Sequence, residues 1–150
     1  MIPPALRRDD ALSFHGWLTH KAFWAALERK LKGTGLSPVQ YLALGYLMSP
    51  EPVIQSYLAG SLSITVPTCV RLIDRLERDG FVTRQADPND ARMKLLTPTV
   101  KAAGLWKEIG HLGPELLEDA YEGISAEEID TVKRVLARVR QNYERPASGG

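Results

Sequence analysis

The chain has 150 residues, a length typical of one domain with a substantial hydrophobic core. Charged residues make up 25% of the sequence and apolar residues 44%, and no apolar run approaches the ~20 residues of a membrane helix. The net charge of +1 excludes binding to a partner through bulk charge alone. The single cysteine excludes an internal disulfide. We therefore expect a cytoplasmic protein outside the membrane, and the charged run at 7–10 argues against a signal peptide.

Three helices are predicted before the middle of the chain. Residues 13–31 carry apolar side chains on more than one stripe, which indicates a long helix buried against several neighbours, including a partner chain. The sequence Ser37-Pro38-Val39-Gln40 is a capping box with proline at the first helical position, so a second helix should run to about Met48. A short helix is expected over 55–62, where the small Ala59 suits a close helix crossing.

Residues 65–80 predict a helix with two chemically different faces. Thr65 can cap its start, Pro67 fits its first turn and Gly80 can end it. The buried stripe has apolar residues at i, i+3, i+4 and i+7: Cys69, Leu72, Ile73 and Leu76. The other face carries Thr68, Arg71, Arg75 and Arg78.

Hydroxyl and guanidinium groups on one helix face suit the major groove of DNA. Arg71 could reach a guanine edge or a phosphate, and Thr68 a phosphate or a thymine methyl. The alternative is an ordinary amphipathic surface helix whose arginines pair with its own acids, Asp74, Glu77 and Asp79.

A basic hairpin is predicted directly after this helix. Strands are expected at 81–85 and 93–96, and the residues at 87–90 are turn formers. Phe81 and Thr83 should face one side of the first strand, and Val82 and Arg84 the other. The basic residues near the tip are Arg84, Arg92 and Lys94. A guanidinium there can enter a narrow minor groove, and Asp90 is expected to hold the loop through a charge-assisted hydrogen bond.

Two further helical segments complete the predicted chain. Thr99 can cap a helix to about Tyr121, which Gly113-Pro114 should kink or interrupt. Ser125-Ala126-Glu127-Glu128 is a second capping box, whose helix should reach about Tyr143. The fold class is therefore mainly α with a small β-wing, a winged helix-turn-helix of about six helices. The expected organisation is a single domain over 1–150, with the winged helix-turn-helix at 37–99, dimerisation helices at 13–32 and 99–143, and a polar tail at 145–150.

These motifs resemble those of the MarR family of bacterial transcription regulators. The resemblance spans residues 13–140 and rests on Leu58-Ala59, Pro67-Thr68, Val70-Arg71, Leu76-Glu77, Gly80 and the loop Asp87-Pro88-x-Asp90-x-Arg92. The start of the 65–80 helix is similar to the SlyA-like branch, and the chain departs from the family pattern at Ile54, Pro98 and Ala102.

The resemblance implies a homodimeric DNA-binding regulator, most simply a repressor, on a pseudopalindromic site in double-stranded DNA. It implies that Pro67, Thr68, Val70 and Arg71 face DNA and that Arg92, oriented by Asp90, enters the minor groove. The full set of expected DNA-binding residues is Pro67, Thr68, Val70, Arg71, Arg75, Arg84, Arg92 and Lys94.

The SlyA-like resemblance also implies an aromatic carboxylate effector in a cleft beside the reading head. Lys21 could pair with the carboxylate, while Trp24 and Tyr41 stack on the ring. The alternative is that both aromatic residues belong to the core and that Lys21 is solvated.

Other functions have weaker support in the sequence. Cys69 falls on the buried stripe, which favours a structural role over an oxidation switch. The three histidines lie singly, without metal-ligand spacing, and no phosphate loop, nucleophile motif or paired carboxylates indicate an enzyme or a cofactor. A winged-helix module that binds protein instead of DNA stays open as the alternative.

Overall fold

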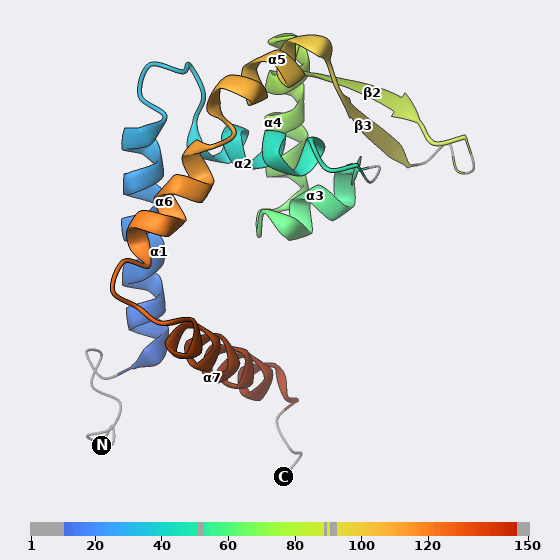
Figure 1. Ribbon diagram of the computed structural model, residues 1–150. Helices are drawn as coiled ribbons and strands as arrows, with labels where there is room; N and C mark the ends of the chain where they lie inside the picture. Colours follow the sequence, from blue (N-terminus) through green and yellow to red (C-terminus); the bar gives the residue numbers. More distant parts are fainter. Residues whose placement is uncertain (1–10, 51–52, 89, 91–92, 147–150) are drawn as a thin grey trace. The chain divides into compact units, whose positions relative to one another are not determined.

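The computed structural model describes residues 11–50, 53–88, 90 and 93–146 (Figure 1). The chain divides into two compact units. The described residues between 24 and 115 form the first, which we call the winged unit, and residues 11–23 with 116–146 form the second, which we call the terminal unit. The predicted winged helix-turn-helix at 37–99 lies entirely within the winged unit.

The winged unit begins with the last part of α1 (Leu12–Lys30), from Trp24 on, and continues through α2 (Pro38–Leu47) and α3 (Gln55–Ser61). The capping box predicted for α2 is confirmed, because the Ser37 hydroxyl accepts from the Gln40 N–H while the Gln40 side chain accepts from the Ser37 N–H. Ile54 precedes α3 without a side-chain cap.

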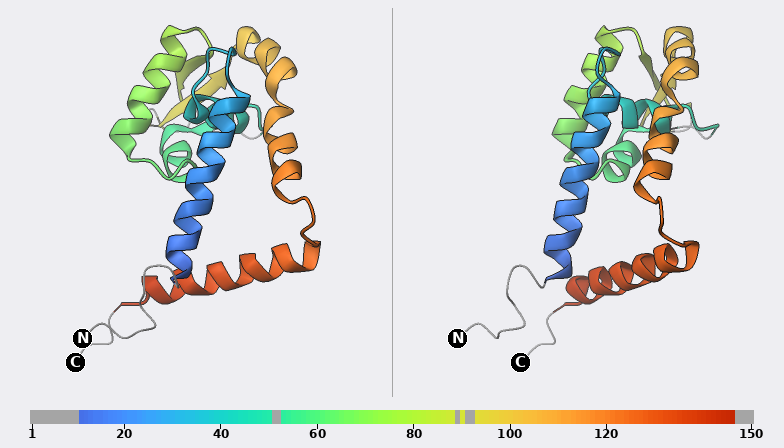
Figure 2. Two further views of the ribbon diagram at one scale, coloured as in Figure 1. Left: turned by 90° about the vertical axis from the view of Figure 1, so that its left-hand side faces the viewer. Right: turned by 60° about the vertical axis from the view of Figure 1, so that its left-hand side comes forward.

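Helix α4 (Val66–Arg78) forms as its sequence predicts. The Thr65 hydroxyl accepts the Thr68 N–H at 3.4 Å, and Gly80 follows the helix with φ of 77°, a conformation that favours glycine. The apolar stripe is buried: Cys69, Leu72, Ile73 and Leu76. Helices α3 and α4 lie side by side (Figures 1 and 2), and Leu58 and Ala59 are buried.

A three-stranded antiparallel sheet completes the wing, in the order β1-β3-β2. Strands β2 (Val82–Ala86) and β3 (Lys94–Pro98) form the predicted hairpin, which extends away from α4 in Figure 1. Strand β1 (Val53–Ile54) pairs with β3 and was not predicted, because two residues are too short to show alternation.

The helix expected from Thr99 to Tyr121 is split into α5 (Val100–Ile109) and α6 (Leu112–Ala120), so the described residues form seven helices. Thr99 caps α5 as predicted, accepting the Ala102 N–H at 3.2 Å. The interruption falls just before the predicted Gly113-Pro114, because Pro114 has no N–H to offer the Gly110 carbonyl. Once the helix is broken there, Pro114 fits the first turn of α6, where its missing N–H costs no helical hydrogen bond.

The terminal unit contains α7 (Ala126–Glu144), which begins at the predicted capping box of Ser125. The Glu128 carboxylate accepts the Ser125 N–H at 2.8 Å, and this hydrogen bond holds the pKa of Glu128 below its usual value. No residue of α7 is buried. Within the described ranges, no helix combines the length and apolar character needed to cross a membrane.

Candidate nucleic-acid interface

The outer face of α4 carries two arginines that are not paired with any described residue. Arg71 and Arg75 are exposed, and neither forms an ion pair with any residue in the described part of the chain. Pro67 and Thr68 are also exposed at the start of the helix, and Val70 is half-buried. Both guanidinium groups are therefore available to an external acceptor such as a phosphate or a base edge.

The acidic residues of α4 form ion pairs mostly with another element, strand β2. Arg78 pairs with Asp79 at 3.0 Å, as the surface-helix alternative expects. Asp74 and Glu77, however, pair with Arg84 from β2. The structure thus departs from a helix that neutralises its own arginines, and it leaves Arg71 and Arg75 open.

The expected position of Arg84 near the wing tip is corrected by the structure. Its side chain points to α4, where Nη2 lies 2.5 Å from Asp74 Oδ1 and Nη1 lies 2.8 Å from Glu77 Oε2. The side chain is only 22% exposed. The strand alternation explains this position, because Arg84 shares a face of β2 with the buried Val82.

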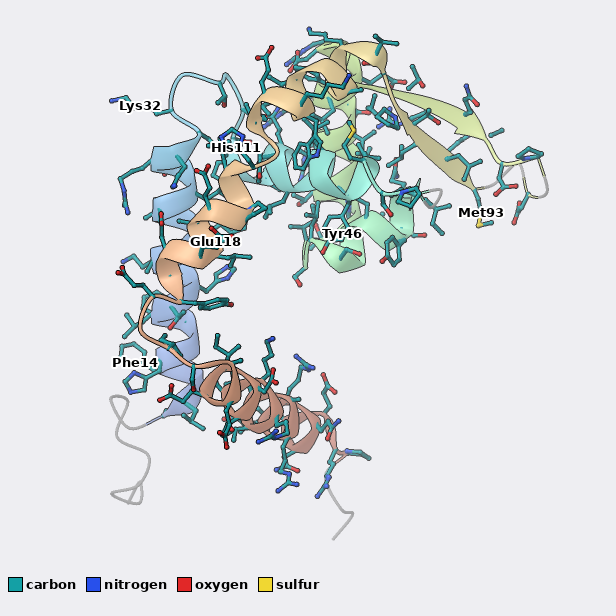
Figure 3. All side chains as sticks on the ribbon, viewed as in Figure 1. Phe14, Lys32, Tyr46, Met93, His111 and Glu118 are labelled. Carbon is teal, nitrogen blue, oxygen red and sulfur yellow. The ribbon has the colours of Figure 1, made fainter. Side chains whose placement is uncertain are left out.

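The wing loop is closed by backbone hydrogen bonds. The Asp87 N–H donates to the Met93 carbonyl at 3.0 Å, and the Met93 N–H donates to the Asp90 carbonyl at 2.9 Å. Lys94, the first residue of β3, is exposed, and so is Met93 just before it, which Figure 3 labels. Arg92 lies outside the described residues, and so does its predicted pairing with Asp90.

Two exposed apolar residues near this face were not predicted from the sequence. Val66 is 55% exposed at the start of α4, and Tyr57 on α3 is 59% exposed. A hollow of about 170 Å³ is lined by Ile54, Gln55, Ser56, Val66, Met93 and Lys94, so it joins the starts of α3 and α4 to the loop end of the wing hairpin. No sequence signal marked Val66 as exposed, because it lies three residues before Cys69 at the helical spacing of the apolar stripe. Its exposed methyl groups suit contact with a thymine methyl.

Cys69 is part of the core behind this face. It is 0% exposed, and its thiol donates to the Gln55 carbonyl at 3.6 Å. Burial raises the pKa of the Cys69 thiol, and the nearby Arg84 charge opposes this only in part. A reactive thiol needs the opposite conditions, so these observations favour the structural role.

Tyr41 of α2 bridges the break between α5 and α6. Its hydroxyl accepts the Gly113 N–H at 2.8 Å and donates to the Gly110 carbonyl at 3.1 Å. The Gly110 carbonyl is the group that Pro114 leaves without a helical donor. The phenol therefore replaces the missing backbone partner, and burial raises its pKa.

A pocket of about 320 Å³ adjoins this phenol within the winged unit. It is lined by Tyr41, Leu42, Gly45, Tyr46, Ser49 and Trp106. The rings of Tyr41 and Trp106 lie 5.1 Å apart, centroid to centroid. Of the three predicted effector residues only Tyr41 lines it: Trp24 is not among the lining residues, and Lys21 belongs to the terminal unit, with its ammonium 5.5 Å from the Trp17 ring.

Replacing Tyr41 with phenylalanine should destabilise the winged unit by about 1–3 kcal/mol, since it removes two part-buried hydrogen bonds that contribute about 0.5–1.5 kcal/mol each. Urea unfolding followed by circular dichroism measures the loss. Tyr46→Phe is a matched control, because the Tyr46 hydroxyl makes one exposed hydrogen bond, to the Ser61 carbonyl at 3.4 Å. Equal losses in the two variants would contradict the bridging role of Tyr41.

Comparisons with known proteins agree with this geometry. The family model described as "MarR family" matches residues 36–94. The HTH-type transcriptional regulator YybA of Bacillus subtilis strain 168 is 32% identical over 116 residues, which cover 77% of each chain.

Solved structures share the fold over most of the chain. The transcriptional regulator PA3341 superposes with a TM-score of 0.80 at 32% identity, covering 89% of this chain and 98% of that one. MepR of S. aureus, in a complex with DNA, superposes with a TM-score of 0.78 at 23% identity, covering 88% of this chain and 98% of that one.

Proposed function

Because the chain belongs to the MarR family of DNA-binding transcriptional regulators, we propose that it acts as a homodimer that binds a specific pseudopalindromic operator, most simply as a cytoplasmic repressor. The observation that carries the proposal is the outer face of α4, where Arg71 and Arg75 are exposed without ion-pair partners among the described residues. The SlyA-like branch stays a prediction from the sequence.

The DNA-binding surface in this proposal joins α4 to the wing. Thr68 and Arg71 contact base edges or phosphates in the major groove, and the exposed Lys94 contacts the backbone beside them. Pro67, Val70 and Arg75 complete the helical side, with Val66 added from the structure. Arg92 stays the predicted minor-groove residue on the strength of the family resemblance.

The dimer is supported by the apolar surface of the terminal unit. Helices in proteins gain most of their stability by packing an apolar face, yet the 19-residue α7 has no buried residue, so its apolar side lacks a covering surface within the described chain. The large apolar residues exposed in this unit include Leu12, Trp17, Leu18, Leu117, Tyr121, Ile124, Val132, Val135, Leu136 and Tyr143. A second copy of the chain is the occupant that the family suggests for this surface, and it would place two α4 helices on half-sites about one helical turn apart.

Fluorescence anisotropy with a labelled fragment from upstream of the coding gene tests the proposal. We expect salt-sensitive binding: with about six phosphates contacted per dimer, affinity should fall roughly 10³-fold between about 50 and 200 mM salt. Sedimentation of the same complex should give two chains per operator. A winged-helix module that binds only protein would show no salt-sensitive anisotropy change on any fragment, and that result would replace the proposal.

A small aromatic carboxylate is the proposed effector, and the apolar pocket beside Tyr41 and Trp106 supports this part. Such a ligand can release DNA only if it binds one conformation of the protein more tightly than the other. Benzoate is a suitable probe, because it should quench tryptophan fluorescence and lower operator affinity over the same concentration range. Quenching without any loss of affinity would remove the effector from the account.

A further inference from the structure

We propose that Arg84 is a positioning residue for DNA recognition: it fastens the wing to α4 and occupies Asp74 and Glu77, so that Arg71 stays available to DNA. This inference rests on the proposed DNA-binding function. It assigns to Arg84 a role opposite to the one its sequence position suggests, because its guanidinium acts on the protein and not on the nucleic acid.

Both terminal nitrogens of the Arg84 guanidinium are engaged by α4. Nη2 bonds Asp74 Oδ1 at 2.5 Å and also donates to the Val70 carbonyl at 3.3 Å, while Nη1 donates to Glu77 Oε2 at 2.8 Å. The backbone N–H of Arg84 donates to the other Glu77 oxygen at 3.3 Å. The wing strand is therefore joined to two successive turns of the recognition helix by one residue.

The location of these contacts excludes a simple phosphate contact. The Arg84 Nε atom is buried and has no hydrogen-bond partner among the described residues, and the terminal nitrogens face α4. Reaching a phosphate would require breaking both ion pairs and exposing a side chain that is now 22% exposed. Lys94, on the neighbouring strand of the same hairpin, is exposed and forms no ion pair with the residues that the structure describes.

The charges on α4 explain why the contacts of Arg84 with Asp74 and Glu77, which we call the clamp, matter for DNA recognition. Asp74 lies three residues after Arg71, a spacing at which opposite charges pair on a helix surface. Without Arg84, Asp74 is free to pair with Arg71 and compete with DNA for its guanidinium. Glu77 would likewise present an unneutralised carboxylate to the phosphates. Arg84 thus removes two unfavourable carboxylates from the DNA face and fixes the wing beside the helix with the same contacts.

Four proteins separate this role from a direct contact: the wild type, Arg84→Met, Asp74→Asn with Glu77→Gln, and the triple variant. Operator affinity is measured by anisotropy over a range of salt concentrations. Arg84→Lys tests charge alone, because a lysine keeps the cation but lacks the fork that joins two carboxylates and a carbonyl. Lys94→Met is the matched control, since it removes one exposed cation from the same hairpin.

We expect Arg84→Met to weaken operator binding by about 10-fold, which is within the range of coupling between residues of one ion-pair network. The slope of log affinity against log salt concentration should not change, because Arg84 contacts no phosphate. Lys94→Met should instead lower that slope by about 1 for each phosphate that the lysine neutralises in the wild type. Once Asp74 and Glu77 are neutral, adding Arg84→Met should cost less than about 3-fold. Arg84→Lys should recover only part of the affinity.

A slope reduced in Arg84→Met as much as in Lys94→Met would overturn the inference and make Arg84 a phosphate ligand. An equal loss of affinity with and without the two carboxylates would also overturn it. Urea unfolding of the four proteins without DNA is a separate measurement: the midpoint shifts must be non-additive if the clamp exists. If the wild type binds no DNA, the proposed function is wrong. If the urea midpoint shifts of the variants are additive, the clamp is wrong, whatever the outcome of the DNA measurements.

Discussion

Replacing Arg71 with alanine should weaken operator binding by about 5- to 150-fold for each subunit, the range for removing one well-placed bidentate pair to a base. The structure gives Arg71 no competing ion pair among the described residues and exposes it in the second turn of α4. The weaker binding should come with relaxed base preference at one position of each half-site. Competition with single-base operator variants in an anisotropy assay measures both effects.

Arg78→Ala is the matched control for this prediction. Arg78 is another arginine of α4, but it lies in the last turn and pairs with Asp79 at 3.0 Å. Its removal should change operator affinity much less than the removal of Arg71. If the two variants bind alike, or if base preference is unchanged in Arg71→Ala, the assignment of Arg71 to base recognition is wrong.

Replacing Leu76 with alanine should lower the free energy of unfolding by about 2–5 kcal/mol, the usual cost of truncating a fully buried leucine. Leu76 is 0% exposed on the apolar stripe of α4, so the variant leaves a cavity behind the DNA-binding face. Because the same helix presents Arg71 and holds Arg84, operator binding should fall together with stability. Urea unfolding measures the first effect and anisotropy the second.

Val100→Ala is a control of similar chemistry, because Val100 is 91% exposed at the start of α5. It should leave the unfolding midpoint almost unchanged. A loss below about 1 kcal/mol in Leu76→Ala would mean that the stripe of α4 is not packed as described.

The elements that the sequence predicted well are those with local signals. Helix α4 has its cap at Thr65, its proline in the first turn, its apolar stripe and its glycine stop within sixteen residues of one another. The capping boxes at Ser37 and Ser125 are likewise local, and both are confirmed. Such signals depend on neighbours in the sequence, so they can be interpreted without knowing the tertiary structure.

The features that were missed depend on partners far away in the sequence. The position of Arg84 is decided by Asp74 and Glu77, although the alternation of β2 had already placed it beside Val82. A buried Val82 therefore implied a largely buried Arg84, which argued against a tip position. The helical break at Gly110 depends on Pro114, but its bridge comes from Tyr41, about seventy residues earlier, and no local pattern indicates that pairing.

Hydroxyl-radical footprinting of the protein on its operator tests the central claim most directly. If α4 and the wing form one DNA-binding surface on each half of a dimer, two symmetric protected regions should appear about 10 base pairs apart, each extending into a flanking minor groove. Arg71→Ala should weaken both regions equally. A single protected region would contradict the account. Protection that persists unchanged at every salt concentration would contradict it as well.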